Sequence, residues 1–157
     1  MINIKIVCIG QLSQKYWKSA AKDYLERIKK RTNIETKNII ESKLNSIPNN
    51  IKIETNKITE YISKNNDYQW FLLDLSGQLI SSEQLSEMIN KNQIYQQGKI
   101  GFIIGGSNGV AQILKDNINL IKISFGKITL PHQLCYVVLL EQIYRSLQIL
   151  NNQSYHK

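Results

Sequence analysis

The sequence predicts an α/β protein with a mostly parallel sheet of five or six strands and helices on both faces. Two patterns indicate this fold class. Short continuous apolar runs, typical of strands buried on both faces, alternate with segments whose apolar residues recur every three or four positions, as on one face of a helix. Because parallel neighbours need a crossover connection, usually a helix, this alternation favours a parallel sheet. The 157 residues are expected to form a single domain, 1–157.

The first half of the chain opens with an apolar strand that ends at Gly10 and continues into an amphipathic helix. The apolar face of that helix includes Trp17 and Leu25, while its other face carries Lys18 and Lys22, as expected of a helix on the protein surface. The expected elements are a strand at 2–9, a helix at about 16–28, a strand at 34–40 and a weaker helix at about 51–63.

The second half has clearer boundaries. Ser81 with Gln84, or Ser82 with Glu83, offers a helix N-cap, and Pro131 suits the first turn of the last helix. The expected elements are a strand at 69–75, a helix starting at 81 or 82, a strand at 99–104, a short helix at about 110–117, a strand at 120–125 and a helix from 131 to about 150.

The last expected helix is apolar on most of its circumference. Residues such as Leu134, Val138, Ile143 and Ile149 cover more than the single stripe that packing on a sheet requires. In a chain of this size a second copy is the favoured cover, so we expect a homodimer. The alternative is a helix buried entirely within its own domain.

The charge of the chain is compatible with a nucleic-acid partner, and its composition argues against metal and disulfide chemistry. The net charge is +8, and the first fifty residues hold ten of the twenty basic residues but only four of the twelve acidic ones. The cluster Lys29–Arg31 suits a phosphate backbone, although a solvated helix face explains it equally well. Cys8 and Cys135 lie in apolar segments, where a free cysteine behaves as a small hydrophobe. No metal is expected, because Cys, His, Asp and Glu do not cluster at ligand spacing.

The sequence also predicts where the protein resides. It lacks the pattern of a signal leader and any apolar run of membrane-spanning length, so we expect a cytoplasmic protein with no membrane partner.

Two loops are candidates for a ligand site. Gly105, Gly106 and Gly109 follow a buried strand, where glycine lets the backbone approach a ligand closely, although a tight turn explains them nearly as well. Their spacing matches neither the dinucleotide fingerprint nor a P-loop. The loop from Phe125 to Leu130 can present backbone amides and carbonyls, which suits a neutral heterocycle better than a phosphate.

The remaining polar candidates have ordinary structural explanations. His132, in the first turn of an apolar helix, is more readily a hydrogen-bonded structural histidine than a catalytic one. Asp74, at the carboxyl end of its strand, is the only acid in a position typical of catalysis, and it can simply bind a turn or a helix N-terminus. The tail with Tyr155 and His156 can supply an aromatic surface and a base, but chain ends are usually frayed.

Taken together, five segments resemble the ribosomal RNA large subunit methyltransferase H family of the SPOUT superfamily. Each is common alone, but the ordered set ending in Tyr-His-Lys is specific and covers essentially the whole chain. One departure is Gly126, where the family pattern favours serine or another small residue. The matching segments are FLLDLSG at Phe71–Gly77, FIIGGSNG at Phe102–Gly109, SFGKITLPHQ at Ser124–Gln133, EQIYR at Glu141–Arg145 and YHK at Tyr155–Lys157.

The resemblance implies a C-terminal trefoil knot, which is an exception to the rule that chains are unknotted. It also implies a homodimer and S-adenosyl-L-methionine held in the knot, largely by backbone groups. The residues that would contact this cofactor are Leu73, Gly105, Gly106, Phe125, Gly126, Lys127, Ile128, Thr129 and Leu130.

The reaction implied by the resemblance is methylation of N3 of a pseudouridine in helix 69 of 23S ribosomal RNA, within the assembled ribosome. His156 would accept the proton, with Arg145 and Tyr155 positioning the base or its phosphate, and the tail of one subunit can complete the site of the other. Two alternatives remain: a knotted methyltransferase acting on transfer RNA or another ribosomal site, and a non-catalytic RNA-binding factor without affinity for the cofactor.

Overall fold

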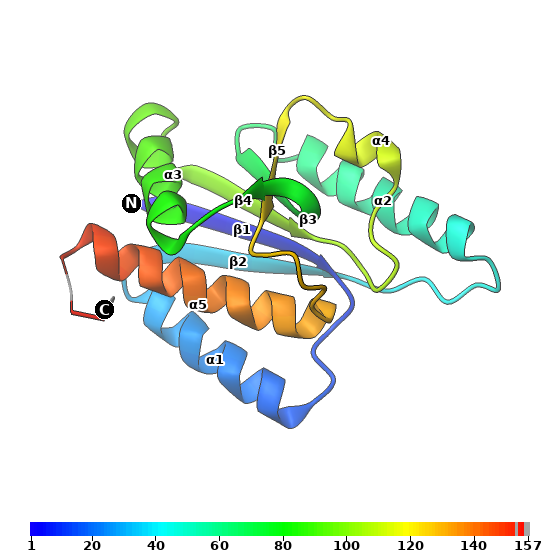
Figure 1. Ribbon diagram of the computed structural model, residues 1–157, viewed down its shortest axis with the longest axis horizontal. Helices are drawn as coiled ribbons and strands as arrows, with labels where there is room; N and C mark the ends of the chain where they lie inside the picture. The colour runs from blue at the N-terminus through cyan, green and yellow to red at the C-terminus, as the bar shows by residue number, and fades with distance from the viewer. Residues whose placement is uncertain (153, 156–157) are drawn as a thin grey trace.

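The computed structural model describes residues 1–152 and 154–155 (Figure 1). Five strands alternate with five helices, as the sequence predicts. The elements are β1 (Ile2–Ile9), α1 (Lys15–Lys29), β2 (Thr32–Ile39), α2 (Ile47–Ser63), β3 (Gln69–Leu79), α3 (Ser82–Tyr95), β4 (Lys99–Ile104), α4 (Gln112–Lys115), β5 (Leu120–Ser124) and α5 (His132–Leu150).

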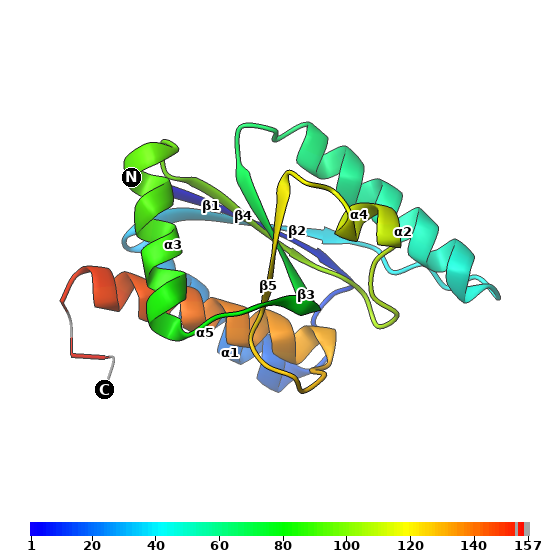
Figure 2. The same ribbon diagram turned by 45° about the horizontal axis from the view of Figure 1, so that its top comes forward.

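The strands form one sheet in the order β2-β1-β4-β3-β5, and each neighbouring pair is parallel. Helices α1, α3 and α5 cover one face of this sheet, and α2 and α4 cover the other (Figure 2). The predicted α/β class with helices on both faces is therefore confirmed. Since all strands run the same way, their carboxyl ends gather at one end of the molecule.

Strand β1 shows how the sequence builds two cores. Ile4 and Ile6 point to the side of α1, α3 and α5, whereas Val7 and Ile9 point to the side of α2 and α4. All four are at most 1 % exposed. Burial on both faces accounts for an almost uninterrupted apolar strand, because neither set of alternate side chains meets water.

Helix boundaries follow local capping chemistry. The Ser81 hydroxyl accepts from the Gln84 amide nitrogen at 3.1 Å, and the Gln84 side chain accepts from the Ser81 amide at 2.8 Å, which confirms the first of the two predicted caps. Helix α2 begins at Ile47, earlier than expected, because Ser46 caps it and Pro48 lies in its first turn. The first N–H groups of a helix have no partner within the helix, so a proline, which lacks an N–H, fits there. Pro48 therefore belongs to the helix and not to the loop before it.

Strand β3 runs past its expected end and crosses its neighbour. It pairs with β5 at Trp70–Leu73 and again at Gln78–Leu79, with a register shift between the two stretches. At the crossing Gly77 lies against the β5 backbone, where a Cβ would come within 2.6 Å of the Ile123 nitrogen. Only a residue without a side chain permits this approach.

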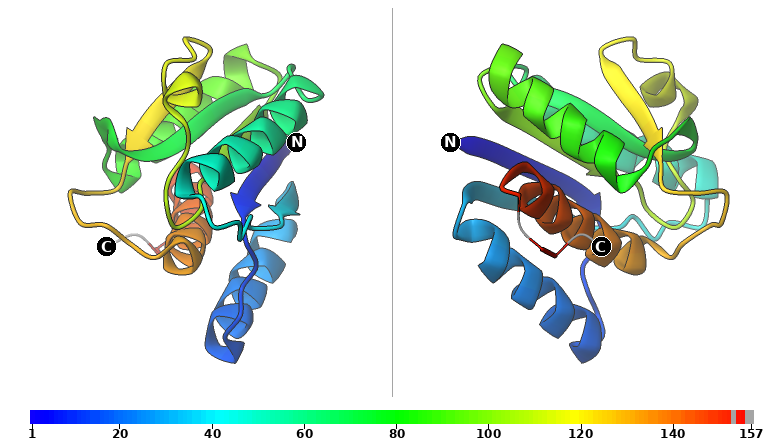
Figure 3. Two further views of the ribbon diagram at one scale, coloured as in Figure 1. Left: turned by 90° about the vertical axis from the view of Figure 1, so that its right-hand side faces the viewer. Right: turned by 60° about the vertical axis from the view of Figure 1, so that its left-hand side comes forward.

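Helix α5 lies between α1 and α3 on one face of the sheet (Figure 3). Its inner residues Leu139, Leu140 and Ile143 are fully buried. On its outer side a stripe including Leu134 and Val138 remains half-buried. The chain therefore covers much of the apolar circumference itself but leaves this stripe partly open. Within the described residues no helix is long and apolar enough to cross a membrane.

Candidate functional site

Three of the segments singled out in the sequence meet at the carboxyl ends of adjacent strands. Leu73 lies on β3, opposite Ile123 of β5. Gly105 and Gly106 follow the end of β4, and the loop Phe125–Leu130 follows β5. Because β4, β3 and β5 are neighbours in the sheet, the three segments converge at one edge of it. This is the position at which parallel α/β sheets bind ligands.

The glycine segment forms a tight turn. Gly106 and Gly109 make an isolated antiparallel bridge, in which the Gly109 amide donates to the Gly106 carbonyl at 3.0 Å. Gly109 has φ of +77°, a left-handed conformation that glycine adopts without strain. The requirement for glycine at this position is therefore conformational.

The other two glycines are required by packing against the chain itself. A Cβ at Gly105 would lie 2.9 Å from Cγ1 of Val110, and one at Gly106 would lie 3.0 Å from both Cγ2 of Ile9 and Oε2 of Glu54. The space beside these glycines is thus filled by protein side chains. Any substitution there acts on a ligand by displacing the turn.

Glu54 of α2 is a site residue that sequence reasoning missed. It is 4 % exposed, and its Oε1 accepts from the Ser42 amide at 2.9 Å. Burial raises the pKa of this carboxyl group, and the nearby Glu41 acts in the same direction. One feature of the sequence could have indicated Glu54. It lies four residues from both Asn50 and Ile58, so the three share one face of α2, and that face is buried.

Side chains from α2 and the preceding loop hold the glycine turn in place. Glu41 accepts from the Ser107 hydroxyl at 2.5 Å. The Thr55 hydroxyl accepts from the Ala111 amide at 2.9 Å, on the far side of the turn. The turn is therefore anchored at both of its ends.

The loop Phe125–Leu130 presents unpaired backbone groups. The Ser124 hydroxyl donates to the Gly126 carbonyl at 2.7 Å and so fixes the start of the loop. In the part of the chain that the structure describes, the backbone of Lys127–Leu130 makes no hydrogen bond, and Ile128 is 80 % exposed. Free N–H and C=O groups are what recognition of a neutral heterocycle requires, so this loop is a candidate binding surface for such a ring.

Asp74 binds a turn, which is the structural role that the sequence offered as an alternative to catalysis. Its Oδ1 accepts from the amide and hydroxyl of Ser76 at 2.8 and 2.9 Å, and Lys115 lies 3.2 Å from Oδ2. Burial alone would raise the pKa of this carboxyl group, but the hydrogen bonds from Ser76 and the Lys115 ammonium together lower it. Asp74 thus binds a turn, as a charged acceptor.

Tyr155 lies against the second half of α5. Arg145 pairs with Glu141 at 2.7 Å, and the Tyr155 hydroxyl donates to the same carboxylate oxygen at 3.3 Å. Tyr155 also stands edge-on to Tyr144, with ring centroids 4.9 Å apart. Burial, with the neighbouring Tyr24 and Glu141, raises the pKa of Tyr155 to about 12, so this hydroxyl stays protonated at neutral pH.

The structure does not bring this tail to the loops at the strand ends within one chain. Arg145 is thirteen residues beyond His132, where α5 leaves those loops, and a helix rises about 1.5 Å per residue, which separates them by about 20 Å. Arg145 and Tyr155 accordingly lie towards the end of α5 that is opposite to the loops. His156, the expected proton acceptor, lies outside the described residues.

Cysteine and metal chemistry find no support in the described residues. Burial raises the pKa of Cys8 to about 12 and that of Cys135 to about 11, so neither is a thiolate nucleophile at neutral pH. No group of three potential metal ligands occurs among these residues. His132 lies beside Gly10, where a Cβ would come within 3.0 Å of its Nε2, and its expected hydrogen bond is not found among the described residues.

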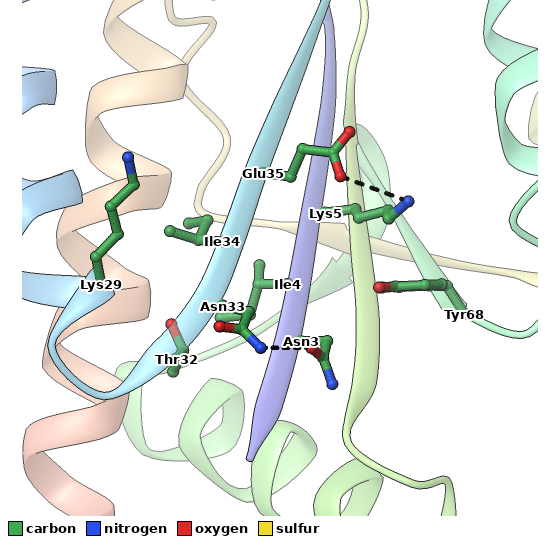
Figure 4. A pocket seen from close by; sticks show the side chains of 9 residues that line it. All are labelled: Asn3, Ile4, Lys5, Lys29, Thr32, Asn33, Ile34, Glu35 and Tyr68. Atoms are coloured by element: carbon green, nitrogen blue, oxygen red, sulfur yellow. Dashed lines mark hydrogen bonds and ion pairs between the residues drawn. The ribbon is translucent and has the colours of Figure 1, made fainter.

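A hollow of about 340 Å³ lies at the other end of the sheet, at the amino ends of β1 and β2 (Figure 4). Its polar side chains largely satisfy one another. Lys5 lies 3.6 Å from Glu35, and the Asn33 amide donates to Asn3 at 3.0 Å. This hollow is therefore a weaker candidate for a ligand site than the loops at the carboxyl ends.

A parallel sheet with a glycine turn and an open loop at its carboxyl edge is typical of ligand-binding α/β proteins. The comparison with known families is more specific, since residues 2–156 match the family described as "Predicted SPOUT methyltransferase". The chain belongs to the SPOUT methyltransferases and, within them, to the ribosomal RNA large subunit methyltransferase H family.

The similarity to this family extends over the full chain. The ribosomal RNA large subunit methyltransferase H of Mycoplasma mycoides is 43 % identical, with 99 % of this chain and 100 % of that protein covered. The protein of the same name from Fusobacterium nucleatum is 41 % identical over the same shares. A probable methylase family protein from Haemophilus influenzae has a TM-score of 0.52 at 14 % identity, covering 99 % of this chain and 71 % of that one, and supports the fold alone.

Proposed function

We propose that this SPOUT methyltransferase acts in the cytoplasm on large-subunit ribosomal RNA and transfers the methyl group of S-adenosyl-L-methionine to N3 of a pseudouridine in helix 69 of 23S RNA. The observation that carries the proposal is the convergence of Leu73, the turn at Gly105–Gly106 and the loop Phe125–Leu130 at adjacent strand ends. The names of the relatives support the RNA class.

The described residues supply a binding site for the cofactor. The free backbone groups of Lys127–Leu130 hold the adenine, Leu73 gives an apolar contact, and the anchored turn closes the site. S-adenosylmethionine, when bound, supplies a methyl group already activated as a sulfonium, so the protein has mainly to align it with the nucleophile. A C-terminal trefoil knot, in which the C-terminal part of the chain threads through a loop, would fix these segments relative to one another.

The tail supplies the groups that act on the RNA. The imidazole of His156 would accept the proton that N3 loses when the methyl group passes to it from the sulfonium sulfur, which would leave as a neutral thioether. Arg145 offers a cation that stabilises the developing negative charge or binds a neighbouring phosphate. Tyr155, whose hydroxyl donates to Glu141, offers its aromatic ring as a surface that positions the base.

A site that combines the cofactor loops with the C-terminal residues requires two copies of the chain. Since tail and loops are about 20 Å apart along α5 of one chain, a functional site needs the tail of a second subunit. The half-buried outer stripe of α5 supports a homodimer, because pairing would complete its burial. An assembled ribosome then presents the RNA to this shared site.

Calorimetric titration with S-adenosylmethionine tests the cofactor site. We expect saturable binding that is lost in Gly106→Val, because the added side chain displaces the turn from Glu54 and Ile9. Lys52→Ala, on the exposed side of α2, is the matched control and should bind as the wild type does. RNA binding without any affinity for the cofactor would instead indicate a non-catalytic RNA-binding factor.

A further inference from the structure

A groove of about 530 Å³ lies between α1, the edge strand β2 and the first turns of α5, and we call it the α1–β2 groove. Its lining includes Lys18, Lys22, Asn38, Gly10, His132 and Tyr136. The volume falls within the range of pockets that hold small organic ligands, about 300–1,000 Å³. No role for this groove follows from the cofactor site alone.

The groove adjoins the proposed cofactor site. Cys8 of β1 is in register with Ile104 of β4, so Gly10 and Gly106, each two residues further on, leave the sheet side by side. His132 contacts this point, since a Cβ at Gly10 would lie 3.0 Å from its Nε2. His132 also follows the loop Phe125–Leu130 by two residues. A molecule in the groove therefore lies next to the turn and the loop that hold the cofactor.

The polar groups that line the groove suit a nucleobase. The buried Cys8 thiol, whose pKa is raised to about 12 by burial, donates to Oδ1 of Asn38 at 2.9 Å. That bond orients the Asn38 amide, whose Nδ2 has no partner among the described residues. The Tyr136 hydroxyl is bonded to Thr36 at 3.0 Å, so its ring is held in the wall. Asn38 and His132 thus offer free polar groups beside an aromatic and apolar surface, as recognition of an unstacked base requires.

The rim of the groove is basic. Lys18 and Lys22 lie one turn apart on α1, and Lys29 lies further along the same helix. Glu26 is the acidic side chain among the described lining residues, 3.9 Å from Lys22 in an exposed pair. Lysines around an apolar pocket match a nucleotide, whose base is buried while its phosphates remain at the surface.

We propose that the α1–β2 groove binds one unstacked nucleotide of the RNA substrate, with the base against Tyr136, Asn38 and His132 and the flanking phosphates on Lys18 and Lys22. The inference rests on the proposed function and identifies where its substrate enters. It places the substrate on the side of the glycine turn where β1 and α5 meet, whereas the Glu54 side of that turn is closed by packing.

The test uses large ribosomal subunits from a strain that lacks the gene, with tritiated S-adenosylmethionine as the methyl donor. Lys18→Ala/Lys22→Ala should raise KM for the subunits and lower the slope of log affinity against log salt by about two, because two phosphate contacts are lost. Asn38→Ala should lower kcat/KM roughly tenfold through a lost base contact. Cofactor affinity by calorimetry should not change in either variant. The matched control Lys52→Ala/Lys57→Ala removes the same charge from α2 and should behave as the wild type does.

The outcomes separate the groove from the proposed function. Wild-type kcat/KM in both groove variants, with methyl transfer and cofactor binding intact, would overturn the groove as the substrate site and leave the function standing. Dissociation of a dimer by Lys18→Ala/Lys22→Ala in sedimentation would assign the groove to a second copy of the chain and also overturn the inference. Absence of methyl transfer by the wild type would overturn the proposed function itself.

Discussion

At the scale of single residues, the candidate site depends on the loops and on the buried side chains that pack against them, such as Glu54. The sequence identified Gly105, Gly106 and Phe125–Leu130, because glycines and a compact polar loop at strand ends are visible in the chain itself. It could not identify Glu54, since the partner atoms at Ser42 and Gly106 come from segments 12 and 52 residues away that only folding brings together.

Glu54 leads to a prediction about stability and pH. Burial raises its pKa in the folded chain, so the stability linked to its protonation is fully present below the unfolded value near 4.5 and is lost as pH rises through the folded pKa. Glu54→Gln removes that loss and should be more resistant to urea than the wild type at about pH 8, with the difference shrinking towards about pH 4. Urea unfolding across this range measures it, and a difference that does not depend on pH would contradict it.

At the scale of elements, the periodicity of the sequence predicted each strand and helix, because each period reflects which faces are buried. The end of β3 could not be predicted. Leu75 and Leu79 are exposed although apolar, and Gly77 looks like an ordinary turn until β5 is placed against it. The start of α2 was missed because Pro48 reads equally well as a turn and as a first helical residue.

The crossing of β3 and β5 provides a direct test. Gly77→Ala places a methyl group 2.6 Å from the Ile123 nitrogen, so the two backbones must separate. We expect a loss of about 1–3 kcal/mol in the free energy of unfolding, as for other overpacked sites. Gln78→Ala, at an exposed neighbouring position, is the control and should change stability by less than about 0.5 kcal/mol. Equal stability of the two variants would show that the crossing is not close-packed.

At the scale of the whole molecule, α5 connects two parts of the proposed chemistry that a single chain keeps apart. It begins at His132 beside the cofactor loops and ends beside Arg145 and Tyr155, which are tied to Glu141. The sequence predicted a helix too apolar for one chain, but the spatial separation of tail and loops needed the structure. The proposed knot rests on the family resemblance alone, because periodicity reports burial and not the path of the chain.

A shared site predicts complementation between two inactive variants. Gly106→Val impairs the cofactor site but keeps a normal tail, whereas Arg145→Ala does the reverse. In a mixed dimer, the cofactor site of the second subunit and the tail of the first form one complete site. Refolding the two together in equal amounts should restore about a quarter of wild-type methyl transfer, since half of the dimers are mixed and each has one complete site. Activity no higher than that of the separate variants would place the whole site within one chain.

The central claim is that this chain methylates a pseudouridine of large-subunit ribosomal RNA at N3. A methyl group there blocks the base-pairing edge, so reverse transcription stops at the modified nucleotide. The most direct measurement is primer extension through helix 69 on ribosomes from a deletion strain, before and after incubation with the purified protein and S-adenosylmethionine. The account predicts a stop in helix 69 that appears only when protein and cofactor are both present. Incorporation of tritiated methyl with no stop there would contradict the site, and no incorporation into any large-subunit RNA would contradict the function.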